Sequence, residues 1–154
     1  MIEKEVTNIG CLRNNGLHLF MIATQFEATY ARKVFPCFDE PAMKAKFKLS
    51  IVHDSNHIAV SNMPEESKES MENNLSKTVF IESATMSTYV LFFSVSDLEQ
   101  ISSSYKQTQI RVFAPSDRLE EARHGLNLTV KLLGNFENYF GVPYSLPKLV
   151  IIKR

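Results

Sequence analysis

Thr24-Gln25-Phe26-Glu27 closes an apolar segment, and nine residues further on comes the stretch Pro36-Cys37-Phe38-Asp39-Glu40-Pro41. The two prolines of the second stretch fix two φ angles and bias the residues before them towards extended backbone. Arg32, Asp39 and Glu40 are expected to form a local ion-pair network that holds this loop. We therefore interpret the second stretch as a rigid scaffold that lies behind the first.

The sequence around these stretches, from residue 17 to about residue 114, has the pattern of β-structure. Residues 17–23 are apolar enough for a strand, and residues 46–52 alternate between polar and apolar with a period of two. The polar turn Asp54-Ser55-Asn56 predicts a hairpin between this second strand and the strand after it. Further strands are predicted at residues 57–61, 78–82, 88–95 and 109–113, with polar loops at residues 64–74 and 102–107.

The last third of the chain changes to a helical period. Pro115-Ser116-Asp117 is a helix-start signal, and two acidic residues follow in the first turn, where the helix dipole favours them. An apolar stripe then predicts one helix over residues 117–140, ended by Gly141-Val142-Pro143. The stripe consists of Leu119, Ala122, Leu126, Val130, Leu133, Phe136 and Phe140.

The composition excludes several kinds of partner. Lys and Arg total 17, as do Asp and Glu, so no overall field favours nucleic acid or an anionic membrane. The longest apolar run, residues 89–93, is too short to span a bilayer, so we expect no membrane segment in this chain. Residues 1–6 include acidic side chains and lack the apolar region of a signal peptide, so we expect no targeting signal there.

Two tripeptides match the acceptor pattern for N-glycosylation, Asn74-Leu75-Ser76 and Asn127-Leu128-Thr129. Such patterns arise often by chance, and the second one falls inside the predicted helix. They are weak indications of a luminal or extracellular protein.

Together, the two opening stretches resemble the signature of the aminopeptidase N family of zinc metallopeptidases, which includes the oxytocinase-like and thyrotropin-releasing-hormone-degrading enzymes. The similarity covers roughly residues 14–149. It implies a mainly β fold followed by one long α-helix, the β-part being an antiparallel β-sandwich or saddle from the second half of the family's N-terminal domain. Residues 1–114 would then complete that domain, and residues 115–154 would begin the peptidase domain. Further segments that resemble the family, in the same order along the chain, are residues 28–35, 61–64, 86–89, 133–140 and 144–149.

The resemblance implies substrate-binding roles for Gln25 and Glu27, because in the family these positions line the pocket for the free N-terminus of a peptide. A fixed carboxylate at Glu27 would recognise the terminal ammonium by charge-assisted hydrogen bonding, and would count off one residue from the terminus. Gln25 would touch the first residue of the substrate. The alternative is that both side chains are simply solvated at the end of a strand; the second stretch, at the family's spacing, favours the functional interpretation.

The zinc-binding motif H-E-x-x-H of the family does not occur in these 154 residues, and neither does its G-A-M-E-N loop. We therefore assign no catalytic residue and no metal ligand here, and expect zinc in a full-length parent enzyme, with none bound by this chain. His53 and His57 have the i, i+4 spacing of a zincin motif, but that motif requires a helix. The turn-prone residues between them indicate a surface turn instead.

We expect the chain to be a fragment of a zinc aminopeptidase that removes N-terminal amino acids from peptides. It would carry the segment that binds the substrate's N-terminus, and the parent would be membrane-anchored, extracellular or luminal. The alternative is a non-catalytic β-domain that acts as an interaction module or as a regulator of a full-length relative, with the exposed apolar stripe of its helix as the contact surface.

Overall fold

We describe residues 20–153 from a computed structural model, in which the chain divides into two compact units between residues 97 and 98. The predicted strand at residues 17–23 therefore lies partly outside the described residues. The predicted domain boundary between residues 114 and 115 concerns the family's domain organisation and stays a prediction.

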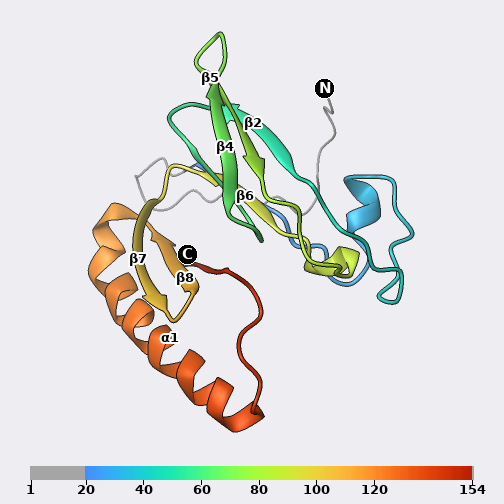
Figure 1. Cartoon of the computed structure of the whole chain (residues 1–154). Helices are drawn as coiled ribbons and strands as arrows, with labels where there is room; N and C mark the ends of the chain where they lie inside the picture. The colour runs from blue at the N-terminus through green and yellow to red at the C-terminus, as the bar shows by residue number, and fades with distance from the viewer. Residues whose placement is uncertain (1–19, 154) are drawn as a thin grey trace. The chain divides into compact units, whose positions relative to one another are not determined.

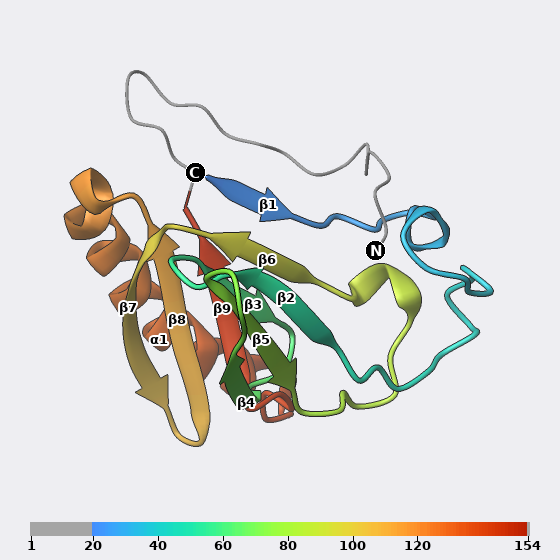
Figure 2. The same ribbon diagram turned by 90° about the horizontal axis from the view of Figure 1, so that it is seen from above.

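The first unit consists of two three-stranded antiparallel sheets, with the strand orders β1-β6-β3 and β2-β5-β4 (Figures 1 and 2). Phe80 of β5 packs in one buried cluster with Ala59 of β3 and Val95 of β6, so the two sheets share a core. The strands are β1 Met21–Ala23, β2 Ser50–Asp54, β3 Ile58–Ser61, β4 Glu65–Ser70, β5 Leu75–Phe80 and β6 Phe93–Ser96.

The second unit is a three-stranded sheet covered by one helix. Strands β7 and β8 form an antiparallel hairpin, and β9 lies parallel to β8 after a crossover through the helix α1 (Figure 2). Such a crossover is the usual way to join two parallel neighbours, because the chain must return from the C-terminal end of the first strand to the opposite end of the sheet, where the second strand begins. The bounds are β7 Glu99–Tyr105, β8 Thr108–Ala114, α1 Leu119–Phe140 and β9 Lys148–Ile152.

The prediction of a mainly β chain followed by one long helix is confirmed. Ala122 and Leu126 of α1 lie in a buried cluster with Ile110 and Val112 of β8, as the apolar stripe requires. The C-terminal end of the apolar stripe is not buried in this way, because the side chains of Phe136 and Phe140 are 53% and 66% exposed.

Several predictions about the strands are wrong in detail. The segment predicted as a polar loop at residues 64–74 contains β4, whose side chains are all exposed, and the loop predicted at residues 102–107 lies largely within β7. Residues 88–90 of a predicted strand form a 3-10 helix, η2 (Thr88–Val90). The predicted hairpin across the turn at residues 54–56 does not form either, because β2 pairs with β5 while β3 pairs with β6.

The end of α1 is fixed by Glu137, whose side chain is nearly buried. Its carboxylate accepts hydrogen bonds from the Tyr105 hydroxyl (3.1 Å), from the backbone N–H of Tyr144 (2.8 Å) and from the ammonium of Lys106. The hydrogen bond from Lys106 is the main reason why the pKa of Glu137 is lowered. One carboxylate thus ties the helix to the β7–β8 turn and to the loop that leads into β9.

We expect Gly141→Ala to destabilise the second unit by about 1 kcal/mol, because Gly141 ends α1 in the left-handed conformation (φ 66°), which disfavours a Cβ. Gly125→Ala is the matched substitution, since a Cβ at either position has no neighbour within 4 Å. Because Gly125 lies inside the helix, Gly125→Ala should instead stabilise the second unit by roughly 0.5–1 kcal/mol. Urea unfolding of both variants measures the difference, and equal effects would contradict the assigned helix end.

Candidate functional site

The predicted binding segment directly follows β1, and its side chains alternate between buried and exposed. Thr24 and Phe26 are buried, while Gln25 and Glu27 are exposed. Thr24 is joined to the start of β6 through its backbone N–H and its hydroxyl, which both donate to the carbonyl of Phe93 (3.0 and 3.2 Å). The same hydroxyl accepts from the N–H of Phe93 at 3.0 Å. Thr24, which directly precedes the two candidate residues, therefore holds the segment on the sheet.

Phe26 anchors the segment in an aromatic cluster. Its ring makes edge-to-face contacts with Phe35 and Phe93, with centroid separations of 6.1 and 6.3 Å, and Phe35 makes a further one with Phe47. Such pairs contribute about 0.5–1.5 kcal/mol each beyond the burial of their surface. Phe35 directly precedes the Pro36-to-Pro41 stretch, and Cys37 within the stretch packs against the same cluster as Phe26.

Gln25 and Glu27 lie next to each other at the surface of this anchored segment. The backbone N–H of Glu27 donates to Oε1 of Gln25 at 3.4 Å, and the peptide bond between Glu27 and Ala28 is cis. The chain then turns, as the N–H of Tyr30 donates to the carbonyl of Phe26 at 3.0 Å. The structure thus brings both predicted residues together, and their contact with a substrate remains a prediction.

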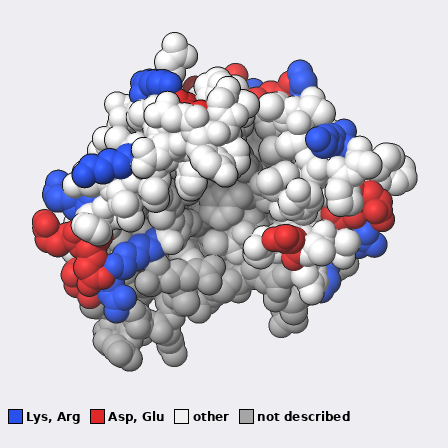
Figure 3. Space-filling model, turned by 90° about the horizontal axis from the view of Figure 1, so that it is seen from below, with Lys and Arg blue, Asp and Glu red and all other residues white. Residues whose placement is uncertain are grey.

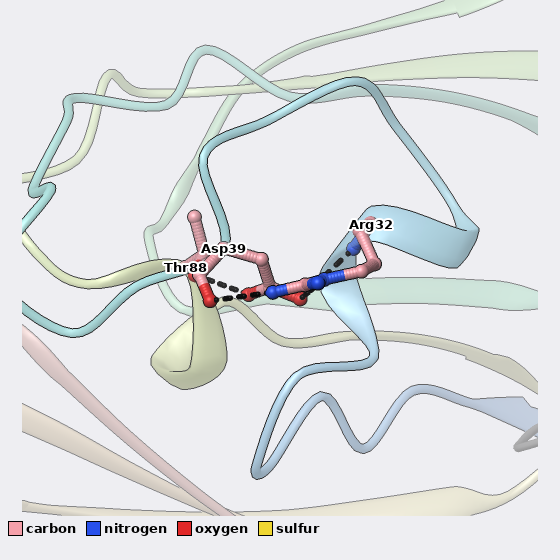
Figure 4. A network of polar contacts seen from close by, with 3 residues as sticks. All are labelled: Arg32, Asp39 and Thr88. Carbon is pink, nitrogen blue, oxygen red and sulfur yellow. Dashed lines mark hydrogen bonds and ion pairs between the residues drawn. The ribbon is translucent and has the colours of Figure 1, made fainter.

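The loop behind the site is held by a buried carboxylate, Asp39 (Figure 4). Its Oδ2 accepts from the backbone N–H of Arg32 at 3.1 Å and from the guanidinium Nε at 3.3 Å. Its Oδ1 accepts from the hydroxyl of Thr88 at 2.7 Å, and the Nη2 of Arg32 donates to the Asp39 carbonyl at 3.1 Å. Arg32 lies in the 3-10 helix η1 (Ala31–Lys33), so one side chain connects η1 with η2.

The predicted ion pair between Arg32 and Asp39 is confirmed, but two details differ from the prediction. Glu40 is exposed and forms no ion pair with any residue between 20 and 153, so its predicted place in the network is wrong. Thr88, which lies 49 positions from Asp39, completes the network instead. The one indication of Thr88 in the sequence is that it lies in the family-like segment at residues 86–89.

The network also sets the ionisation of Asp39. Burial raises the pKa of this carboxyl, but the hydrogen bonds from Thr88 and Arg32 and the charge of Arg32 outweigh burial, so its pKa is below the ordinary value of 3.8. Asp39 is therefore a carboxylate at neutral pH. Because its side chain is only 1% exposed, its role is to position the loop.

Cys37 is a half-buried thiol beside this network, in a surface pocket of about 500 Å³ that it shares with Phe35, Phe38 and Met43. Burial raises the pKa of Cys37, and the negative charge of Asp39 raises it further. A thiol that stays protonated is a poor nucleophile, so a structural role fits this position.

The two histidines at residues 53 and 57 make contacts of their own. His53 is buried, with Nε2 at 2.9 Å from the Thr78 hydroxyl and Nδ1 at 2.8 Å from the Asp54 carbonyl. His57 stacks on Phe20 at a centroid separation of 4.6 Å. Within residues 20–153, no group of three or more His, Cys, Asp or Glu side chains is arranged to hold a metal ion.

The charged side chains are mixed in sign. On the face shown in Figure 3, Lys and Arg lie beside Asp and Glu, and the described residues form no extended patch of either charge. Among these residues, no helix has both the length and the apolar character needed to cross a membrane.

Comparison with known proteins gives consistent matches. The family description "Peptidase M1 N-terminal domain" matches residues 11–90. The chain is 41% identical over 134 residues to endoplasmic reticulum aminopeptidase 1 of Rattus norvegicus, and 42% identical over 138 residues to glutamyl aminopeptidase of Bitis rhinoceros. These alignments cover 86% and 88% of the chain, but the chain spans only 14% of the length of each relative.

Proposed function

The chain belongs to the M1 family of peptidases, and we propose that it forms the part of a zinc aminopeptidase that holds the free N-terminus of a peptide substrate. The observation that carries this proposal is the pair Gln25 and Glu27, exposed side by side on a segment whose alternate residues are buried in the sheet. A free N-terminus carries an ammonium group, and Glu27 offers the carboxylate that pairs with it.

The scaffold supports this role because it restricts the backbone that carries Glu27. Three hydrogen bonds fix Thr24 to Phe93, and the aromatic cluster fixes Phe26. A carboxylate on a restrained backbone loses less conformational freedom when it binds a ligand, so more of the interaction contributes to affinity. The buried Asp39 network restrains the loop on the other side of the cluster in the same way.

Enzymes of the M1 family use zinc to activate the water that attacks the peptide bond. The residues described here do not fit a zinc site, because they include no suitable group of ligands. We therefore derive no hydrolytic step from this chain, and propose that the metal and its ligands belong to another part of the enzyme. We also propose a luminal or extracellular location, since a matched relative is named as an endoplasmic reticulum aminopeptidase.

A chimera tests the proposal: this chain replaces the matching segment of rat endoplasmic reticulum aminopeptidase 1, to which it is 41% identical. We expect the chimera to release amino acids from peptides with a free N-terminus and to leave N-acetylated peptides intact. A folded, zinc-loaded chimera that cleaves neither peptide, or both equally, would contradict the proposal.

The exposed end of α1 favours a second candidate function, that of an interaction module. Phe136, Tyr139 and Phe140 are exposed there, beside a largely apolar groove of about 560 Å³. Exposed apolar surface of this kind is typical of an association site, here for a full-length relative. Light scattering after size-exclusion chromatography, with and without the rat relative, discriminates the two functions. A compact monomer that does not bind the rat relative would contradict the proposal of an interaction module.

A further inference from the structure

The turn between β4 and β5 contains an acceptor pattern that the proposed peptidase function does not use. Asn73 and Asn74 are its two central residues, both with φ of 58°, and the N–H of Leu75 donates to the carbonyl of Glu72 at 3.3 Å. Positive φ at both central positions is the requirement of a type I′ hairpin turn, and Asn tolerates it well. Asn74 thus opens the tripeptide Asn74-Leu75-Ser76 at the tip of a two-stranded hairpin (Figure 1).

The side chain of Asn74 can carry a large group without loss of core packing. Asn74 is exposed, and so are all the residues that precede it from Glu65 onwards. Among residues 20–153, its Nδ2 donates one hydrogen bond, to Oδ1 of Asp54 at 3.3 Å, and a substituted amide keeps one N–H for this contact. Position 74 therefore accommodates a glycan in the folded hairpin.

The second acceptor pattern has a different environment. Asn127 lies in the middle of α1, and the hydroxyl of Thr129 donates to the carbonyl of Gly125 at 2.8 Å. Its neighbour Leu128 is an exposed apolar side chain. Acceptor asparagines are typical of surface loops, so the hairpin tip is the better candidate.

We propose that Asn74 is a site of N-linked glycosylation, with a lipid diphosphate-linked oligosaccharide as the glycosyl donor. The amide nitrogen of Asn74 forms a bond to the anomeric carbon of the sugar, and the bond between that carbon and the diphosphate oxygen breaks. The lipid diphosphate leaves, and the proton lost by the amide passes to a base of the transferase, so no oxidant or reductant is needed. This inference rests on the luminal or extracellular location proposed above.

The fold also determines when the transfer occurs. The Ser76 hydroxyl, which the acceptor pattern requires, is buried in the folded hairpin, where it lies 2.9 Å from the hydroxyl of Ser55. The transferase therefore modifies Asn74 before β4 and β5 pair. Afterwards the glycan stands at the end of β4, an edge strand with exposed backbone groups, where its bulk hinders pairing with another sheet.

The test is cell-free translation of the whole chain behind a cleavable signal peptide, with endoplasmic reticulum membranes present. Because the added signal peptide directs the chain into the lumen, the result does not depend on the proposed location or on peptidase activity. The informative variant is Asn74→Gly, since Gly also accepts positive φ and keeps the turn. Asn73→Gly is the matched control, because it alters the same turn but leaves the acceptor pattern intact.

We expect the wild type and Asn73→Gly to carry an N-glycan at residue 74, removed by a peptide N-glycanase, and Asn74→Gly to lose it. The glycanase hydrolyses the glycosylated side-chain amide, so peptide mass spectrometry identifies the residue from the resulting Asn-to-Asp conversion. Detergent-opened membranes, whose transferase is accessible to an already folded chain, should give no modification when they are added after folding is complete. A wild-type chain without a glycan at residue 74, or a glycan pattern unchanged by Asn74→Gly, would overturn the proposal.

Discussion

Glu27→Gln is expected to lower kcat/KM of the chimeric aminopeptidase by about 30- to 1,000-fold. The substitution keeps the size of the side chain and removes the charge that would pair with the substrate's ammonium. Removing one partner of a desolvated ion pair costs about 2–4 kcal/mol, and about 1.4 kcal/mol corresponds to a tenfold change in rate. Steady-state hydrolysis of an aminoacyl amide by the purified variant measures the effect.

Glu40→Gln is the matched control for this prediction. Glu40 is also exposed, lies on the neighbouring loop, and forms no ion pair with another described residue. It should leave kcat/KM within about twofold of the parent chimera, because a remote exposed charge is screened by solvent. Equal losses in the two variants, or no loss in Glu27→Gln, would show that Glu27 does not anchor the substrate.

The sequence predicted those strands whose apolar side chains alternate or run together. It missed β4, because the side chains of that strand are all exposed and give no apolar period. Its conformation comes from pairing with β5 across the turn at Asn73 and Asn74, which is a tertiary effect. The partners of β2 and β3 were also not predictable, since a period of two indicates a strand but does not identify its neighbour.

The same distinction applies to the candidate site. The pair of Arg32 and Asp39 was predictable because the two residues are seven positions apart in one loop. The third member, Thr88, comes from a distant segment, and only the fold brings its hydroxyl within 2.7 Å of the carboxylate. The substrate-binding roles of Gln25 and Glu27 were predicted from resemblance to a family. The four residues Thr24 to Glu27 are ordinary and do not indicate a binding site by themselves.

Asp39→Ala is expected to destabilise the first unit by about 2–4 kcal/mol. Arg32 and Thr88 direct three hydrogen bonds at this carboxylate, and all three are lost together. Breaking a buried ion pair from one side costs about 3–5 kcal/mol, but the Arg32 side chain is 52% exposed and can turn to water, which lowers the expected cost. Urea unfolding followed by circular dichroism measures the change in the free energy of unfolding.

The adjacent Glu40→Ala makes the same chemical change on an exposed side chain and should alter stability by less than about 0.5 kcal/mol. A pH series then separates charge from packing. Since the pKa of Asp39 is lowered in the folded state, its charge stabilises the fold fully above the ordinary value of 3.8, and this stabilisation is lost as the pH falls through the folded-state pKa. The difference in the free energy of unfolding between wild type and Asp39→Ala should therefore decrease as the pH falls below 3.8. A difference that stays constant through this range would mean that the cavity left by the lost side chain, and not the carboxylate charge, accounts for the destabilisation.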